Sequence, residues 1–143
     1  MFFKFYLKKI KEKKISFYNF FILRFSRLYP LHFFTLLIVL LFYYLNIIYD
    51  FHSYIYADLK HFILNLFLIH EWGFKSIDGT FNDPSWSISV EILMYIVFFV
   101  IALKTNIFLS SFVILILSSI LYFESKWIGY GGYCFFVGGL SYL

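Results

Sequence analysis

The stretch PSWSISVEILMYIVFFVIAL, residues 84–103, decides the fold. After a polar start it stays apolar for about one bilayer thickness, so it predicts a membrane-spanning helix from about Trp86 to Leu103. One carboxylate, Glu91, stands inside this apolar run. A carboxylate at membrane depth costs about 3 kcal/mol or more, so it needs a partner, a water-filled cavity or a proton. Glu91 is therefore a candidate functional residue on physical grounds alone.

The composition places the whole chain in a membrane. Of its 143 residues 62% are hydrophobic, and the mean hydropathy is +0.82. A soluble domain of this length cannot cover that much apolar surface. The single cysteine, Cys134, allows no internal disulfide, and the histidine spacings match no metal site. We therefore predict neither a resident metal nor a resident cofactor.

The net charge of +4 is concentrated near the start of the chain, in residues 1–27, which we interpret as a basic interfacial segment. Positive residues beside a span favour the cytoplasmic side and anionic lipid headgroups, so the N-terminus is predicted to be cytoplasmic. The membrane accounts for this charge, and we predict no nucleic-acid partner. Eight of the twelve Lys and Arg residues lie in this segment: Lys4, Lys8, Lys9, Lys11, Lys13, Lys14, Arg24 and Arg27.

Three apolar runs are long enough for full spans. They cover about Leu28 to Tyr49, Trp86 to Leu103 and Ile107 to Phe123. Residues 59–70 are too short to cross and predict a re-entrant element, while residues 50–58 predict an external loop. A further apolar run opens at Gly129 and predicts a partial fourth span. We therefore expect an all-α integral membrane protein that forms one domain over residues 1–143.

Two polar patterns could carry chemistry. Ser87, Glu91 and Tyr95 recur every fourth residue and form a polar stripe on one helical face, which favours either a functional site or a hydrogen-bonded seam between helices. Arg24 and Arg27 are three residues apart and could fork onto phosphate oxygens at the inner boundary. The alternative is that both arginines only fix the topology by snorkelling.

Three segments resemble the membrane-bound acyltransferase family 3. FILRFSRLYPL at 21–31 resembles its Arg-x-x-Arg segment before a proline. NLFLIH at 65–70, followed by PSWSISVE at 84–91 and then Tyr95, resembles its next stretch. FFVG at 135–138 resembles a later Phe-x-x-Gly element. The order of these segments matches the family from about residue 17 onwards.

The resemblance implies O-acyl transfer, most often of acetyl, from acyl-CoA to a carbohydrate hydroxyl at a bacterial plasma membrane. Acyl-CoA would be the donor substrate, and the arginine pair would contact it. His70 and Glu91 are the candidate catalytic residues. The candidate substrate-binding residues are Arg24, Arg27, Ser85, Trp86, Ser87 and Tyr95.

The chain also departs from the family. It has no counterpart to the family's opening spans, where an Arg and a downstream His that serves as the base lie, and it stops before the family's later spans. We therefore expect a partial chain that is inactive alone unless a complementary membrane chain supplies the missing helices. The alternative is a non-catalytic small membrane protein, either a degenerate remnant or a partner subunit.

Overall fold

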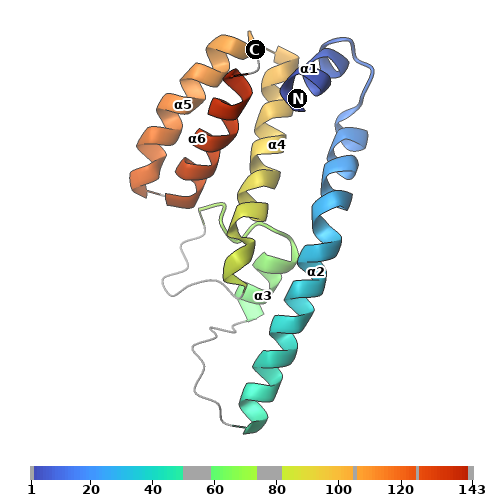
Figure 1. The fold of residues 1–143 in the computed structure, drawn as a ribbon, viewed down its shortest axis with the longest axis vertical. Coiled ribbons are helices and arrows are strands. Elements are labelled where there is room, and N and C mark those ends of the chain that lie inside the picture. Colours follow the sequence, from blue (N-terminus) through green and yellow to red (C-terminus); the bar gives the residue numbers. More distant parts are fainter. Residues whose placement is uncertain (1, 50–58, 74–81, 105, 125, 142–143) are drawn as a thin grey trace.

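The computed structural model describes residues 2–49, 59–73, 82–104, 106–124 and 126–141. In these ranges the chain is all-helical, as predicted (Figure 1). The α-helices are α1 (Phe2–Lys11), α2 (Phe17–Tyr49), α3 (Leu59–Leu66), α4 (Trp86–Lys104), α5 (Ile107–Glu124) and α6 (Lys126–Leu140), and a 3-10 turn, η1 (Asp83–Ser85), leads into α4.

Helix α4 is the centre of the bundle. It contacts α1, α2, α5 and α6, while α5 and α6 pack closely against each other. Figure 1 shows the long helix α2 on one side of α4 and the α5–α6 pair on the other. The start of α1 and the end of α6 lie at the same end of the bundle (Figure 1).

Two of the described helices are long and apolar enough to cross a membrane, with candidate spans at Phe17–Ile48 and Trp86–Leu103. The second has the predicted bounds. The first lies in a helix that begins at Phe17 rather than Leu28, because Ser16 caps it: its Oγ accepts the backbone N–H of Asn19 at 3.2 Å. Pro30 lies inside this helix without ending it.

The shorter predicted elements are also helical where they are described. Helix α3 forms the first eight residues of the segment 59–70, which was expected to be re-entrant. Helix α5 begins where the third run was expected to begin and ends one residue later, at Glu124. Its described residues contain a shorter apolar stretch, Ser110–Ile120, so a third full span is not confirmed. Helix α6 begins at Lys126, three residues before the predicted start at Gly129. The predicted external loop at 50–58 lies outside the described residues.

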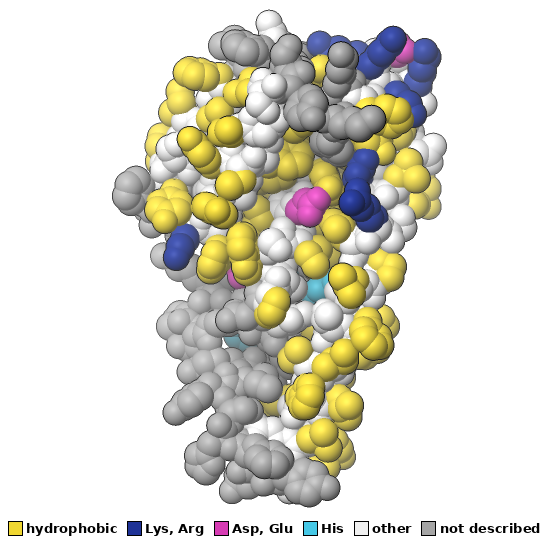
Figure 2. All heavy atoms as spheres, in the orientation of Figure 1, with side chains coloured by type: hydrophobic (Ala, Val, Ile, Leu, Met, Phe, Trp, Pro, Cys, Tyr) yellow, Lys and Arg dark blue, Asp and Glu magenta, His cyan; other side chains and the backbone are white. Residues whose placement is uncertain are grey.

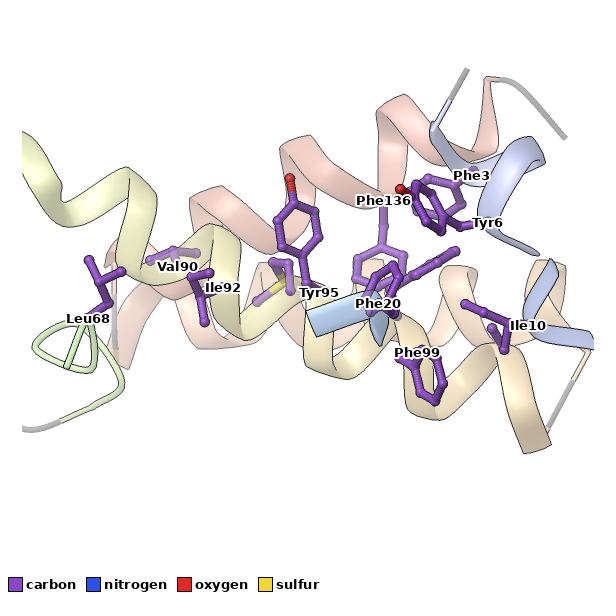
Figure 3. Packing of buried hydrophobic residues seen from close by; sticks show 13 residues of the cluster. Phe3, Tyr6, Ile10, Phe20, Leu68, Val90, Ile92, Tyr95, Phe99 and Phe136 are labelled. Carbon is purple, nitrogen blue, oxygen red and sulfur yellow. The ribbon is translucent and has the colours of Figure 1, made fainter. Parts of the chain in front are cut away.

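An aromatic core joins α1, α2, α4 and α6 (Figure 3). Phe20 of α2 is fully buried, and its ring centroid lies 6.2 Å from that of Tyr95 and 5.3 Å from that of Phe99. From α1, Phe3 packs edge-on against Phe136 of α6. The start of α2 is thereby fixed beside the second half of α4.

This aromatic core fixes the position of α2 along the axis of α4. At 33 and 19 residues, the two helices are about 50 Å and about 28 Å long. Near the start of α4, Asn82 Nδ2 donates to Thr35 Oγ1 of α2 at 3.2 Å. Residues 17–35 therefore run alongside α4, and the rest of α2 extends beyond it (Figure 1).

Helix α1 belongs to the bundle. Its apolar residues Phe3, Tyr6 and Ile10 are buried in the core, whereas Lys8 and Lys11 are exposed. Figure 2 shows basic side chains gathered at this end of the molecule. The segment predicted to be interfacial over residues 1–27 is thus divided between α1, a turn at 12–16 and the first part of α2.

Candidate functional site

Five buried polar residues meet where α2, α3 and the start of α4 come together. Asn65 is 0% exposed, Ser85 2% and His70 3%, and His32 and Asn82 are also buried. Buried polar groups persist when they bond to one another, because each unpaired group costs about 1–3 kcal/mol. This polar cluster lies among largely apolar helices and is the first candidate for a functional site.

Ser85 is the centre of the polar cluster. Its Oγ lies 3.1 Å from His70 Nε2, 3.1 Å from Asn65 Oδ1 and 2.6 Å from the Asn82 carbonyl oxygen. A serine hydroxyl has a single proton, so it donates to only one of these acceptors at a time. When His70 carries its proton on Nδ1, Nε2 is free to accept the Ser85 proton. A hydroxyl within reach of an imidazole in this way is the arrangement of an activated nucleophile.

Asn65 and His32 hold this pair in place. Asn65 Nδ2 donates to the His61 carbonyl at 3.0 Å, which fixes the amide orientation and makes Oδ1 an alternative acceptor for the Ser85 proton. The Asn65 carbonyl accepts from His32 Nε2 at 2.8 Å, so that nitrogen carries a proton. The His32 and His70 rings are stacked, with 6.5 Å between centroids and 11° between planes.

The segment that carries His70 is tied to α4 by Ser89. Ser89 Oγ donates to the Leu68 carbonyl at 2.8 Å, and Trp72 Nε1 donates to the Ser89 carbonyl at 2.9 Å. Leu68 itself has a positive φ of 58°, in the left-handed region, which turns the chain back after α3. These bonds position the His70 ring against Ser85.

A cavity of about 360 Å³ adjoins the polar cluster. His32, Thr35, Asn82 and Ser85 form its polar wall, and Leu31, Ile38, Val39, Pro84 and Ile88 form its apolar wall. Thr35 Oγ1 donates to the His32 carbonyl at 2.8 Å and so links the polar wall to α2. A small, largely apolar group could occupy this cavity beside Ser85.

The other candidate site residues of α4 lie away from the polar cluster. Trp86, Ser87 and Glu91 line a second cavity of about 330 Å³ between α4 and α6. The Tyr95 hydroxyl donates to Glu91 Oε1, so the stripe predicted from the four-residue spacing does contain a hydrogen bond. His70 contacts Ser85, whereas Glu91 lines the second cavity, so the two predicted catalytic residues do not form one site.

The arginine pair differs from its prediction. The Arg24 guanidinium lies 4.3 Å from the Tyr6 ring centroid and 5.7 Å from that of Tyr95, which stands halfway along α4. Arg27 is exposed. We predicted both arginines at the membrane boundary opposite Glu91. Arg24 instead lies at the level of the Glu91–Tyr95 pair, because the first part of α2 packs alongside α4.

Sequence reasoning missed three members of the polar cluster: His32, Asn65 and Asn82. One signal was available for Asn65, because a lone amide in the short apolar helix α3 has to find a partner when buried. His32 and Asn82 gave no comparable signal, since 50 residues of sequence separate them.

Replacing Asn65 with Ala is expected to destabilise the protein by about 1–3 kcal/mol, because the His61 carbonyl and the Ser85 hydroxyl each lose a buried partner. Thermal unfolding in detergent, followed by circular dichroism, measures the effect. Asn19→Ala is the control, because that side chain is exposed and should change stability little. Equal stability of the two variants would mean that the polar cluster contributes nothing to the fold.

Comparison with protein-family models, with curated proteins and with solved structures found no match for this chain.

Proposed function

We propose that this chain is a membrane acyltransferase, or part of one, of the type that the family 3 resemblance implies, and that Ser85 carries the acyl group while His70 acts as its base. The observation that supports it is the contact of 3.1 Å between Ser85 Oγ and His70 Nε2 beside a cavity large enough for a short acyl chain. Serine hydroxyls become nucleophiles when an adjacent imidazole takes their proton.

The reaction would proceed in two balanced steps. Ser85 Oγ attacks the thioester carbonyl while its proton moves to His70 Nε2; the carbon–sulfur bond breaks and the thiolate takes that proton. In the second step an acceptor hydroxyl attacks the acyl-serine, gives its proton to His70, and Ser85 leaves and regains a proton. The products are the acylated acceptor and a free thiol. From the resemblance, we take the acceptor to be a carbohydrate.

The arginines fit an acyl-CoA donor in this proposal. A CoA donor carries several phosphates, and one guanidinium group can bind two oxygens of the same phosphate. Arg27, which is exposed, lies eight residues before Thr35, or about 12 Å along α2. A donor held at Arg27 would extend its thioester arm along α2 towards Ser85.

The proposed location is a bacterial plasma membrane with the N-terminus in the cytoplasm. The lysines at the end of α1, Lys8, Lys9 and Lys11, support that orientation, because basic residues beside spans favour the cytoplasmic side. Ser85 then faces the opposite half of the bilayer. Surface labelling of cysteines placed at Glu12 and at Gly73 would test it: both labelled from one side contradicts the orientation.

The test of the proposed chemistry is where an acetyl group becomes attached. Full-length protein in detergent is incubated with acetyl-CoA or with p-nitrophenyl acetate, an activated ester that needs no phosphate contacts, and peptides are analysed by mass spectrometry. We expect acetyl on Ser85 with the activated ester, and with acetyl-CoA if the donor site is complete. Ser119→Ala, which removes an exposed hydroxyl of α5, serves as the control and should label as the parent does.

The contrary result is a Ser85 that stays unlabelled by both donors while the protein is folded. The polar cluster would then be a hydrogen-bonded latch between α2, α3 and α4, and the non-catalytic alternative would replace the enzyme. Labelling by the activated ester alone would support the nucleophile and place the missing function in donor binding.

A further inference from the structure

The second cavity, between α4 and α6, has a chemistry of its own. It measures about 330 Å³ and is lined by one carboxylate, Glu91, and by the rings of Trp86, Tyr130 and Phe135. Among the described residues that line it none is basic. It shares no lining residue with the cavity beside Ser85. A ligand in this cavity would therefore contact a different set of residues from a group bound beside Ser85.

Glu91 is held ready to accept a positive partner. The Tyr95 hydroxyl donates to Oε1 and orients the carboxylate, which leaves Oε2 as an acceptor. Arg24 lies 5.7 Å from the Tyr95 ring centroid but is not among the residues that line the cavity. A carboxylate in an apolar bundle is stabilised by a cation that enters the cavity, because the low dielectric strengthens their attraction.

The aromatic rings favour the same kind of ligand. The Trp86 and Tyr130 ring centroids lie 6.3 Å apart, and the ring planes are inclined to each other by 58°. The two rings therefore form adjacent sides of the cavity. Phe135 adds a third ring from the next turns of α6. Aromatic faces attract cations within about 6 Å, and groups of such rings are used to recognise methylated ammonium ions.

We propose that this cavity binds a small organic ammonium group, with Glu91 supplying the charge and Trp86 and Tyr130 the aromatic walls. A carboxylate alone would also accept a metal ion, but the ring faces around it favour an ammonium with apolar substituents. An anion or an uncharged sugar would not neutralise the charge of Glu91.

The ammonium group could come from a lipid headgroup or from a free amine. Trp86 begins α4 and stacks on Trp127 in the first turn of α6 at 4.3 Å, and Lys126 lies 5.1 Å from the Trp127 ring centroid. Tryptophans with flanking lysines at helix ends mark the membrane interface, where headgroups lie. The shared chemistry is alkylammonium, and the experiment separates its two sources.

The test uses the full chain in two settings. In neutral detergent, calorimetry measures binding of tetramethylammonium. In lipid nanodiscs, native mass spectrometry measures retention of phosphatidylethanolamine against phosphatidylglycerol. We expect Glu91→Gln to weaken whichever interaction is present by about tenfold or more, since it removes the charge and keeps the shape. Glu12→Gln, which changes a carboxylate near α1, should bind as the parent does.

A second variant guards against a folding defect in Glu91→Gln. Tyr130 is half exposed on α6, so Tyr130→Leu should fold and should still weaken binding, by about threefold or more. Tetramethylammonium binding without phosphatidylethanolamine retention would assign the cavity to a free amine, and retention would assign it to a headgroup. Neither binding, or binding unchanged in both variants, or preference for phosphatidylglycerol, would overturn the proposal.

Discussion

Replacing Ser85 with Ala is expected to lower the rate of acyl transfer to the protein from p-nitrophenyl acetate by about 10³-fold or more. The hydroxyl is the proposed nucleophile, and its nearest imidazole, His70, takes the proton. Release of p-nitrophenolate measures the rate. His70→Gln should lose about as much, and the double variant no more than either single one, because a nucleophile and its base act as a unit.

Two controls keep that result interpretable. Ser85→Cys retains a nucleophile beside His70, so its modification by the ester should recover, which a purely structural role of the hydroxyl would not explain. Circular dichroism confirms that each variant is folded. If Ser85→Ala keeps more than about a tenth of the rate, the ester reacts elsewhere and the Ser85–His70 pair is not catalytic.

Replacing Gly129 with Ala is expected to destabilise the α5–α6 pair by about 3 kcal/mol or more. A Cβ at this position would lie 2.5 Å from the Tyr122 backbone N and Cα and 2.7 Å from the Ser118 carbonyl oxygen. Backbone atoms of a helix cannot move aside singly, so α6 has to move away from α5 and lose its contacts along their length. The midpoint of thermal unfolding in detergent measures the loss.

Gly138→Ala is the matched control, since it is the same change in the same helix. A Cβ there meets nothing within 4 Å. Alanine is the better helix former, so this variant should be unchanged or more stable by up to about 1 kcal/mol. Similar midpoints for the two variants would show that α5 and α6 do not pack through Gly129.

The polar start and apolar run at 84–103 predicted the bounds of α4 closely, because an uninterrupted apolar run of bilayer length in a helix needs no information from elsewhere. The first span was predicted to begin eleven residues after the start of α2. Arg24 and Arg27 interrupt the apolar pattern and so suggested an interfacial segment before the span, whereas in the fold this part of α2 continues beside α4 and the Tyr6 ring of α1 packs on Arg24.

The candidate site was only partly predictable. The Glu91–Tyr95 bond follows from helical spacing alone, since residues four apart lie on one face. The Ser85–His70 contact joins residues on different elements, and its partners Asn65 and His32 come from still others. No local pattern encodes which polar groups meet across a bundle.

The sequence by itself determined an all-helical chain, two helices with the length and composition of membrane spans, and a carboxylate bonded to a tyrosine one turn away. These properties depend on composition and on the helical repeat, which are local. The tertiary structure alone decided that Arg24 lies level with Tyr95, that His70 pairs with Ser85, and that Glu91 lines a cavity away from that pair. Those outcomes depend on the register in which α2 and α3 pack against α4, and that register is set by buried side chains distant in sequence.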